Sequence, residues 1–402
     1  MKITNIKLRQ LVGIIQQPGP FFEERVAGPA NIHSRFKGPK GLTIGILPTP
    51  LGDGRCRITH TFVQIDTDEG VSGVAGPISD PAPPFYIDTQ IKPLLIGEDP
   101  LVTEYLWDIM YRTAVAGRKG ENMHALSYVD IALWDIKAKW LGQPLHRLLG
   151  GPVQDRICAY ASTAGYSLEP AKVRERIKGL KERGFTATKW FMRQGPADGS
   201  ESIKKIVELV ETLREASGPE MKLMIDAWNS WDVPYTLKIA ELIGRYDVSW
   251  IEEPVMPDLI ESYTKLTALS PVPIAGGEHE YTRWGFKALM DMEAMNIYQP
   301  DPAWSGGISE TLKICALASA YDVKVVLHNS LPPVAIHLSF AFNSALVSFI
   351  EYLVIVSEAS QFFFKNPLYP IDGFFTPIDI PGAGMDLDES KIESEREITF
   401  RK

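Results

Sequence analysis

The chain has 402 residues, enough for two or three domains or for one large barrel with additions. Apolar residues make up 45% of it and charged residues 23%, an ordinary globular composition that excludes disordered, collagen-like and coiled-coil proteins. The formal net charge is −9 and no basic run occurs, so nucleic acid is not expected as a partner.

The cysteines and the chain start indicate the cellular compartment. Three cysteines stand far apart, an odd number without metal-type spacing, which favours a reducing cytoplasm. The N-terminus lacks the apolar stretch and cleavage site of a signal peptide. Residues 325–350 carry no Asp, Glu, Lys or Arg, but two prolines and several polar side chains interrupt them. We therefore expect a cytoplasmic protein with no membrane partner.

Residues 1–125 mix strand and helix signals. Residues 3–11 and 58–65 predict strands, and the second continues through the turn Asp68-Glu69-Gly70 into residues 71–74, which predicts a hairpin. Residues 16–55 lie between these strands, are rich in Pro and Gly and have no sustained periodicity. Long segments of this kind are usually functional, so we expect this one to cover a site. Helical patterns follow at 86–95, 101–112 and 122–141.

From about residue 156, short apolar runs alternate with amphipathic helices, which is typical of strand–helix units around a parallel sheet. Eight such strands favour a closed barrel, with the active site at the C-terminal ends of the strands. After about residue 356 the periodicity fades, and we expect the tail to pack on the N-terminal domain. The predicted strands are 157–162, 186–191, 222–225, 249–251, 272–275, 296–299, 324–327 and 346–350, with helices such as 171–181, 203–213, 237–243 and 310–320.

Three carboxylates follow successive predicted strands at equal intervals. Asp226, Glu252 and Glu278 are separated by 26 residues each, about one strand–helix unit, so they are expected on one rim of the barrel. Three anions held together would repel one another unless a cation neutralised them. Hard oxygen ligands favour Mg²⁺. A single strand-end carboxylate is more often a helix cap, but three in register favour a metal site.

Asp301 and His328 continue the series at the next two strand ends. A carboxylate beside an imidazole fixes its tautomer and raises its basicity, as a general base requires, although a lone strand-end histidine is more often structural. Glu351 is expected to end the eighth strand. It either stabilises charge on a substrate carboxylate when protonated, or caps a helix, and the sequence leaves both open.

In combination, these motifs resemble the enolase superfamily, in its mandelate racemase-like group of acid-sugar dehydratases. The resemblance implies an N-terminal α+β capping domain (1–125), a modified TIM-type β/α barrel (126–355), and a C-terminal segment (356–402) on the cap. It also implies one Mg²⁺ held by Asp226, Glu252 and Glu278, and a homo-oligomer, either a dimer or an octamer. The motifs are Ile225-Asp226-Ala227-Trp228, Trp250-Ile251-Glu252-Glu253-Pro254, Gly277-Glu278-His279, Gln299-Pro300-Asp301 with Trp304-Ser305-Gly306-Gly307, and His328-Asn329-Ser330.

The second barrel strand favours dehydration within this group. Racemases carry two lysines separated by one residue there, whereas this chain has Lys189-Trp190-Phe191. Racemisation needs proton carriers on both faces, while elimination of a β-hydroxide can use His328 twice and yields a 2-keto-3-deoxy acid. Lys189 either contacts substrate or forms a salt bridge in the barrel. The alternatives are an epimerase, racemase or cycloisomerase with Lys189 as second base, and a non-catalytic ligand-binding barrel.

Four segments resemble L-rhamnonate dehydratases within this group: Ala30-Asn31-Ile32-His33, Gly195-Pro196-Ala197-Asp198-Gly199, Asp226-Ala227-Trp228 with Asp232-Val233, and Gly277-Glu278-His279. That resemblance implies that His33 reaches the substrate from the long loop, that His279 contacts it beside the metal, and that a basic cap residue, for which Arg55 is our candidate, does so too. The alternatives are an exposed loop histidine for each imidazole and an exposed charge for Arg55. Arg193-Gln194 stand where those enzymes place an aromatic residue, so other aldonates or an aldarate remain possible substrates.

Overall fold

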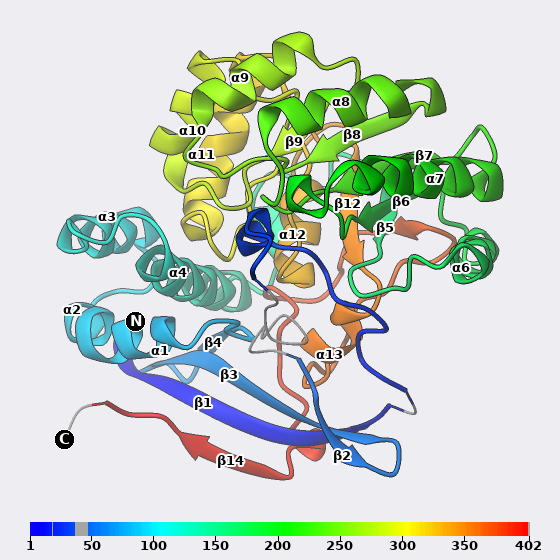
Figure 1. Ribbon diagram of the computed structural model, residues 1–402. Coiled ribbons are helices and arrows are strands. Elements are labelled where there is room, and N and C mark those ends of the chain that lie inside the picture. Colours follow the sequence, from blue (N-terminus) through cyan, green and yellow to red (C-terminus); the bar gives the residue numbers. More distant parts are fainter. Residues whose placement is uncertain (18, 37–46, 401–402) are drawn as a thin grey trace.

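The computed structural model describes residues 1–17, 19–36 and 47–400. An antiparallel sheet lies at one end of the molecule and a barrel at the other (Figure 1). The predicted hairpin is β3 (Arg55–Thr67) and β4 (Ser72–Ala75), and β3 also pairs with β1 (Ile3–Gln16) and β2 (Thr49–Gly52). The C-terminal strand β14 (Ser394–Glu397) pairs with β1, which confirms that the tail completes the cap.

Helices of the cap lie between this sheet and the barrel (Figure 1). The longest, α4 (Glu121–Trp140), packs on both β4 and the barrel helix α11 (Gly307–Ala320), so it is buried over most of its circumference. Its first turn precedes residue 126, the predicted start of the barrel domain. None of the helices in the described ranges is both long and apolar enough to cross a membrane. The remaining cap helices are α1 (Ala82–Tyr86), the π-helix η2 (Ile87–Ile91), α2 (Lys92–Leu95) and α3 (Thr103–Thr113).

The barrel contains the eight predicted parallel strands. They pair in chain order from β5 to β11, and β12 pairs with β5, so the sheet curls back on itself. A backbone hydrogen bond of 2.9 Å from Val325 N on β11 to Leu346 O, in the turn before β12, connects the two remaining edges. The strands are β5 (Ile157–Ser162), β6 (Ala187–Phe191), β7 (Lys222–Asp226), β8 (Val248–Glu252), β9 (Ile274–Gly276), β10 (Ile297–Tyr298), β11 (Lys324–Val325) and β12 (Phe349–Leu353).

Alternate side chains of these strands point to opposite sides of the sheet and belong to three apolar clusters. Tyr160, Met224, Trp250 and Val326 belong to the cluster that fills the barrel. Their strand neighbours pack against the surrounding helices. These helices are α6 (Pro170–Glu182), α7 (Ser200–Ser217), α8 (Val233–Ile243), α9 (Ile260–Leu269), α10 (Thr282–Asp291), α11 and α12 (Pro332–Ser339), with the short α5 (Leu145–Leu148) before the barrel and α13 (Val356–Ser360) after it.

The eighth strand begins later than predicted. The sequence pattern places it at 346–350, but β12 spans Phe349–Leu353. The Asn343 side chain accepts hydrogen bonds from the backbone N–H groups of Ala345 and Leu346, at 3.0 and 3.1 Å, which hold this apolar stretch in a turn. Glu351 therefore lies inside the strand rather than after its end.

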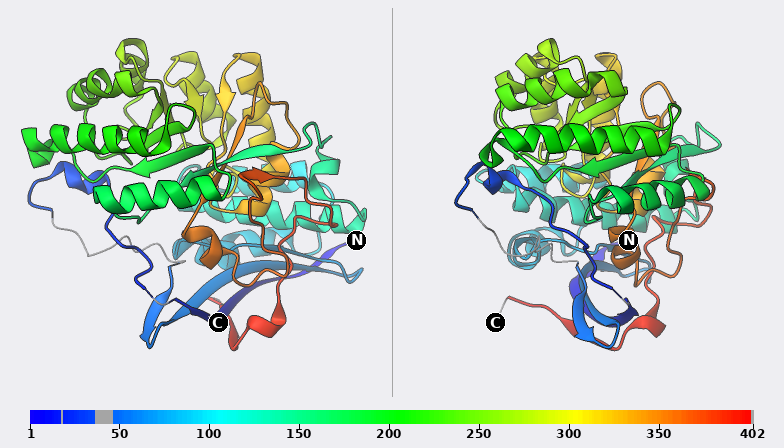
Figure 2. Two further views of the ribbon diagram at one scale, coloured as in Figure 1. Left: turned by 90° about the vertical axis from the view of Figure 1, so that its right-hand side faces the viewer. Right: turned by 45° about the vertical axis from the view of Figure 1, so that its right-hand side comes forward.

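The segment after β1 leaves the cap sheet and reaches the barrel (Figure 2). It contains the short 3₁₀ helix η1 (Pro29–Ile32). Gly28 lies so close to Trp228 that an added Cβ would be 3.2 Å from the indole. Backbone N–H groups of Glu23 and Glu24 donate to Gly165 O at 2.8 and 3.1 Å. Residues 18 and 37–46, also part of the predicted covering loop, lie outside the described ranges.

A single buried carboxylate joins the three parts of the chain. Asp135 on α4 accepts hydrogen bonds from Val74 N (2.9 Å) in the cap sheet and from Ala383 N (2.7 Å) in the C-terminal segment, and pairs with Lys139 at 2.6 Å. Asp135→Ala would leave these donors without their acceptor. We expect it to lower the free energy of unfolding by about 3 kcal/mol.

Urea unfolding followed by circular dichroism measures this difference. The exposed Asp258 is the control, because Asp258→Ala removes the same charge and should change stability by less than about 0.5 kcal/mol. Equal stability of the two variants would contradict the proposed role of Asp135.

Candidate active site

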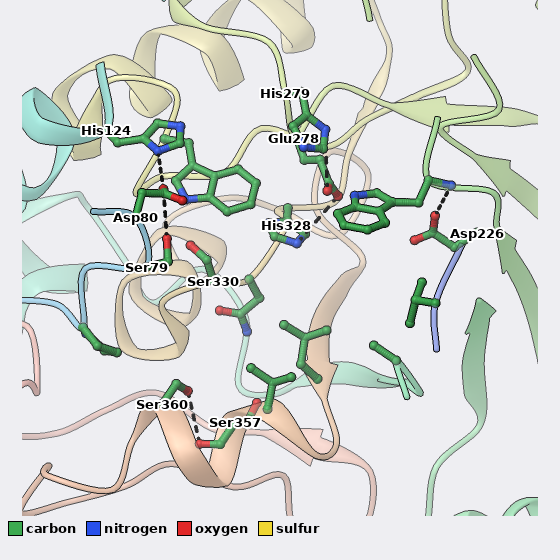
Figure 3. Close-up of a pocket in the computed structure, with 18 of the residues that line it drawn as sticks. Ser79, Asp80, His124, Asp226, Glu278, His279, His328, Ser330, Ser357 and Ser360 are labelled. Atoms are coloured by element: carbon green, nitrogen blue, oxygen red, sulfur yellow. Dashed lines mark hydrogen bonds and ion pairs between the residues drawn. The ribbon is translucent and has the colours of Figure 1, made fainter. Parts of the chain in front are cut away.

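A cavity of about 400 Å³ lies at the C-terminal ends of the barrel strands (Figure 3). Residues of the barrel, the cap and the N-terminal segment all line it, so the predicted covering loop does reach the site, through Phe22 and Val26. The polar residues of its wall include Ser79, Asp80, His124, Lys189, Asp226, Glu278, His279, Tyr281, His328, Asn329, Ser330, Ser357 and Ser360.

The predicted carboxylates come to this region because the parallel strands are in register. Asp226 at the end of β7 lies opposite Glu252 at the end of β8, and both are buried. Glu278 follows β9 and is also buried. Asp226 and Glu278 line the cavity, whereas Glu252 is not among the described lining residues. Its Oε2 accepts from Trp250 Nε1 (2.9 Å) and from Gln299 Nε2 (2.8 Å).

Lys189 on β6 contacts three carboxylates and is 1% exposed. Its Nζ lies 3.1 Å from Asp226 Oδ2 and 2.9 Å from Glu351 Oε1, and it also pairs with Glu252 Oε1. Burial disfavours the ammonium, but Glu252 and Glu351 outweigh this effect and raise the pKa of Lys189 well above its ordinary value. Lys189 therefore holds its proton. The salt bridge that the sequence left open does form, while the same residue also lines the cavity.

The donor chemistry fits a hard divalent cation. Burial raises the pKa of Asp226 well above its ordinary value, with Lys189 opposing, and raises that of Glu278 to about 7, with His328 opposing. These shifts mean that the ionised carboxylates lack sufficient positive charge around them. A cation with oxygen ligands, such as Mg²⁺, would supply that charge.

A second set of possible ligands overlaps the predicted one. Ligand atoms of Glu253, Glu278 and His279 lie within 4.8 Å of one another. Glu253 is already engaged, since both of its oxygens lie 2.9 Å from His279 Nδ1 and Oε2 accepts from Asn229 Nδ2 at 2.8 Å. Burial disfavours the His279 imidazolium, but Glu253 outweighs it and raises the pKa of His279 to about 9. The Glu253–His279 contact thus resembles an internal ion pair. Glu278 is common to both sets.

His328 and Asp301 form the predicted pair. His328 Nδ1 lies 2.5 Å from Asp301 Oδ2, which also accepts from Ser330 N at 3.1 Å, while Oδ1 accepts from Ala303 N at 2.7 Å. These contacts fix the carboxylate, which in turn orients the ring with Nε2 toward the cavity. Nε2 lies 3.6 Å from Glu278 Oε2. Burial opposes the imidazolium, but Glu278 and Asp301 outweigh it and raise the pKa of His328 well above its ordinary value.

Glu351 differs from the expectation in both position and charge. It lies inside β12, is buried, and is not among the described residues that line the cavity. Its Oε2 accepts from Asn329 N at 3.2 Å and lies 3.9 Å from His328 Nε2. Burial would raise its pKa, but Lys189 and His328 outweigh burial and lower it. The ionised form is therefore favoured, which argues against a protonated Glu351 that donates to substrate.

Backbone strain gathers beside the carboxylates. Trp228, Asn229 and Glu253 all have positive φ, at 39°, 57° and 41°. Such values are uncommon for residues with a side chain and persist where the surroundings hold them. Here Asn229 N donates to Glu253 O at 2.6 Å, which ties the ends of β7 and β8 together. The strain is thus located where the candidate ligands are positioned.

The remaining predicted substrate-binding residues are distributed unevenly. His279 lines the cavity, but His33 and Arg55 are not among the described residues that do so. His33 is exposed after η1, and Arg55 pairs with Asp53 at 3.0 Å on the cap sheet. Arg193, which marks the departure in sequence, pairs with Glu24 of the N-terminal segment. The structure thus brings His279, but neither His33 nor Arg55, to the carboxylates.

Several lining residues were not predicted. Asp80 and His124 come from the cap half of the chain, where no strand-end rule applies. Tyr281 and Trp304 follow the β9 and β10 ends, so their proximity to Glu278 and Asp301 was a signal available in the sequence. Glu253 was part of a recognised motif without an assigned role.

Comparisons with known proteins agree with this architecture. Residues 55–150 match the mandelate racemase / muconate lactonizing enzyme N-terminal domain, and residues 172–391 match the enolase C-terminal domain-like family. An L-rhamnonate dehydratase of Saccharopolyspora erythraea is 32% identical over 335 residues, covering 81% of this chain and 82% of that protein.

Solved structures agree as well. A rhamnonate dehydratase from Gibberella zeae complexed with Mg is 29% identical, with a TM-score of 0.82, covering 97% of this chain and 95% of that one. A 3,6-anhydro-D-galactonate cycloisomerase from Zobellia galactanivorans is 27% identical, with a TM-score of 0.78, covering 98% and 100%. The chain therefore belongs to the mandelate racemase / muconate lactonizing enzyme family of the enolase superfamily.

Proposed function

We propose that the chain is a Mg²⁺-dependent dehydratase of an acid sugar, an aldonate such as L-rhamnonate or a related compound, and that it forms a 2-keto-3-deoxy acid. The observation that carries this proposal is the His328–Asp301 pair at 2.5 Å, which faces the same cavity as Asp226 and Glu278. The relatives named rhamnonate dehydratase support the same reaction class.

Asp226, Glu252 and Glu278 would hold the cation. When bound, Mg²⁺ would neutralise the substrate carboxylate and so make the adjacent C–H bond more acidic. Mg²⁺ at these ligands would also offset the carboxylate charge that holds a proton on His328. His328 would then be neutral, as a base must be.

The proton transfers fall to His328. Nδ1 donates to Asp301, so Nε2 accepts the proton from Cα. The electron pair of the broken C–H bond forms the Cα–Cβ double bond as the C–O bond to the β-hydroxyl breaks. The imidazolium gives its proton to that oxygen as the C–O bond breaks, so the hydroxyl departs as water. The remaining enol takes up a proton at C3 and loses the proton of its C2 hydroxyl, which gives the 2-keto-3-deoxy acid. Asp301 keeps its contact with Nδ1 throughout and stabilises the imidazolium.

Lys189 is unsuited to act as a second base. A base on the opposite face must lose its proton near neutral pH, whereas contacts with Asp226, Glu252 and Glu351 keep this ammonium charged. Phe191 occupies the position of the second lysine. Elimination needs only one proton carrier, so we favour it over epimerisation.

A panel of aldonic and aldaric acids, incubated with the protein and Mg²⁺, tests the reaction. We expect a 2-keto-3-deoxy product, measured as a semicarbazone or by mass loss of one water. Product formation should cease with a chelator and return with added Mg²⁺. Deuterium uptake at Cα with inversion, and no loss of water, would instead identify an epimerase. Binding of Mg²⁺ without any turnover of the panel would reject the dehydratase proposal.

A further inference from the structure

The cavity contains a further histidine–carboxylate pair, distinct from His328–Asp301 and from His279–Glu253. Asp80, on the connection between β4 and α1, has its Oδ2 2.8 Å from His124 Nδ1 in the first turn of α4. Ser79 Oγ donates to the same oxygen at 3.1 Å. Figure 3 shows this group on one side of the cavity and Asp226 on the other, with His328 between them.

We propose that Asp80 and His124 bind the hydroxyl groups of the substrate chain beyond C3, and that this wall selects a neutral polyhydroxy tail over a second carboxylate. The inference rests on the proposed function and narrows its substrate class to monocarboxylic acid sugars. It concerns residues of the cap that do not belong to the candidate metal site or to the proton-transfer pair.

The pair is built to accept hydrogen bonds. None of the described residues donates to Asp80 Oδ1, and the Asp80 side chain is 34% exposed, against 10% for His124. Burial would raise the pKa of Asp80, but His124 outweighs it and lowers that pKa, so the carboxylate is ionised. A hydroxyl that donates to an ionised carboxylate forms one of the stronger hydrogen bonds in proteins. Oδ1 is thus a ready acceptor for a sugar hydroxyl.

Ring contacts hold His124 in place and connect it to the reacting end. His124 stacks on Trp304 with ring centroids 5.4 Å apart and planes at 15°, and Trp304 in turn lies 4.9 Å from the His328 ring. Tyr281, on the loop that also carries Glu278, places its hydroxyl 3.4 Å from His124 Nε2. A single substrate molecule can therefore contact His328 at its reacting end and the Asp80–His124 pair at its other end.

The charges of the cavity disfavour a second carboxylate here. Lys189 is the single Lys or Arg among the described lining residues, and three carboxylates already surround it. His279 pairs with Glu253, and His328 pairs with Asp301. Glu121, exposed at the start of α4, adds another negative charge to the cavity wall. A dicarboxylate would thus bring its second anion against Asp80, where every cationic or imidazole side chain among the described lining residues already has a carboxylate partner. Such like-charge contacts discriminate strongly between ligands.

The test compares six-carbon aldonates with the aldarates of the same configuration, using wild type and Asp80→Asn with Mg²⁺. We expect wild type to prefer the aldonate by at least about 100-fold in kcat/KM. Asp80→Asn keeps the shape but loses the charged acceptor. It should lower kcat/KM for the aldonate by about 10- to 100-fold, mainly through KM, and should narrow the preference.

Asp108→Asn is the control, since it removes one charge from an exposed position on α3, outside the cavity. It should leave kcat/KM unchanged within about threefold. Equal turnover of aldonates and aldarates by wild type would overturn the inference while leaving the dehydratase proposal intact. No turnover of any acid sugar would instead reject the dehydratase proposal. If Asp80→Asn is unstable, the wild-type preference between aldonate and aldarate still decides the inference. His124→Ala then replaces Asp80→Asn and should raise KM for the aldonate.

Discussion

His328→Asn is expected to lower kcat by about 10²- to 10⁴-fold while the protein still folds and binds Mg²⁺. Asparagine keeps a polar group near Asp301 but cannot carry the proton from Cα to the leaving hydroxyl. Because both proton transfers use the same ring, the variant can neither remove the proton from Cα nor protonate the leaving hydroxyl. Steady-state kinetics measures the loss of turnover, and calorimetric titration measures Mg²⁺ binding.

Asp301→Asn measures how much the orientation of the His328 ring contributes to turnover, separately from proton transfer by that ring. The amide keeps the size of the carboxylate, but it no longer accepts from His328 Nδ1 with a full charge, so the tautomer and the imidazolium are less well stabilised. We expect a smaller loss, about 10- to 100-fold. The melting temperature and the Mg²⁺ affinity of both variants should stay close to wild type. Turnover near the wild-type rate in His328→Asn would contradict its role as the proton carrier.

The strand-end residues could be predicted because chain spacing determines their location. In a β/α barrel each strand–helix unit returns the chain to the same rim, so Asp226 and Glu252 come into register across β7 and β8. The Asp301–His328 contact follows from the same rule. The fold class was predictable on these grounds too, and the family comparison confirms it.

Other features depend on contacts that a single sequence does not encode locally. Glu351 was misplaced because the apolar residues 346–350 look like a strand, while the Asn343 side chain holds their beginning in a turn. Asp80 and His124 reach the cavity only because α4 packs on α11 and so brings the cap against the barrel. His33 and Arg55 lie in regions where the sequence offered a resemblance but no periodic constraint. Local pattern therefore predicts the rim of the barrel well, and the cap side of the site poorly.

The choice between the two candidate ligand sets leads to the second large effect. Asp226 Oδ2 is held only by Lys189, at 3.1 Å, among the described residues, whereas the Glu253 oxygens already bind His279 and Asn229. A cation can therefore replace Lys189 at Asp226 without breaking a carboxylate–imidazole pair. On this basis, we propose that Asp226 belongs to the metal site and that Glu253 positions His279.

Asp226→Asn is accordingly expected to weaken Mg²⁺ binding by at least about 100-fold and to abolish turnover at ordinary Mg²⁺ concentrations, because it removes one charged ligand of a hard cation. Glu253→Gln is the matched comparison, since it also replaces one buried carboxylate by an amide. It should leave Mg²⁺ affinity within about threefold of wild type. It should instead raise KM, because His279 would be held less firmly. Calorimetric titration with Mg²⁺ measures both affinities without substrate. If Glu253→Gln weakens Mg²⁺ binding more than Asp226→Asn does, then Glu253, Glu278 and His279 hold the ion. The position of the substrate relative to His328 would then have to be derived from that ligand set.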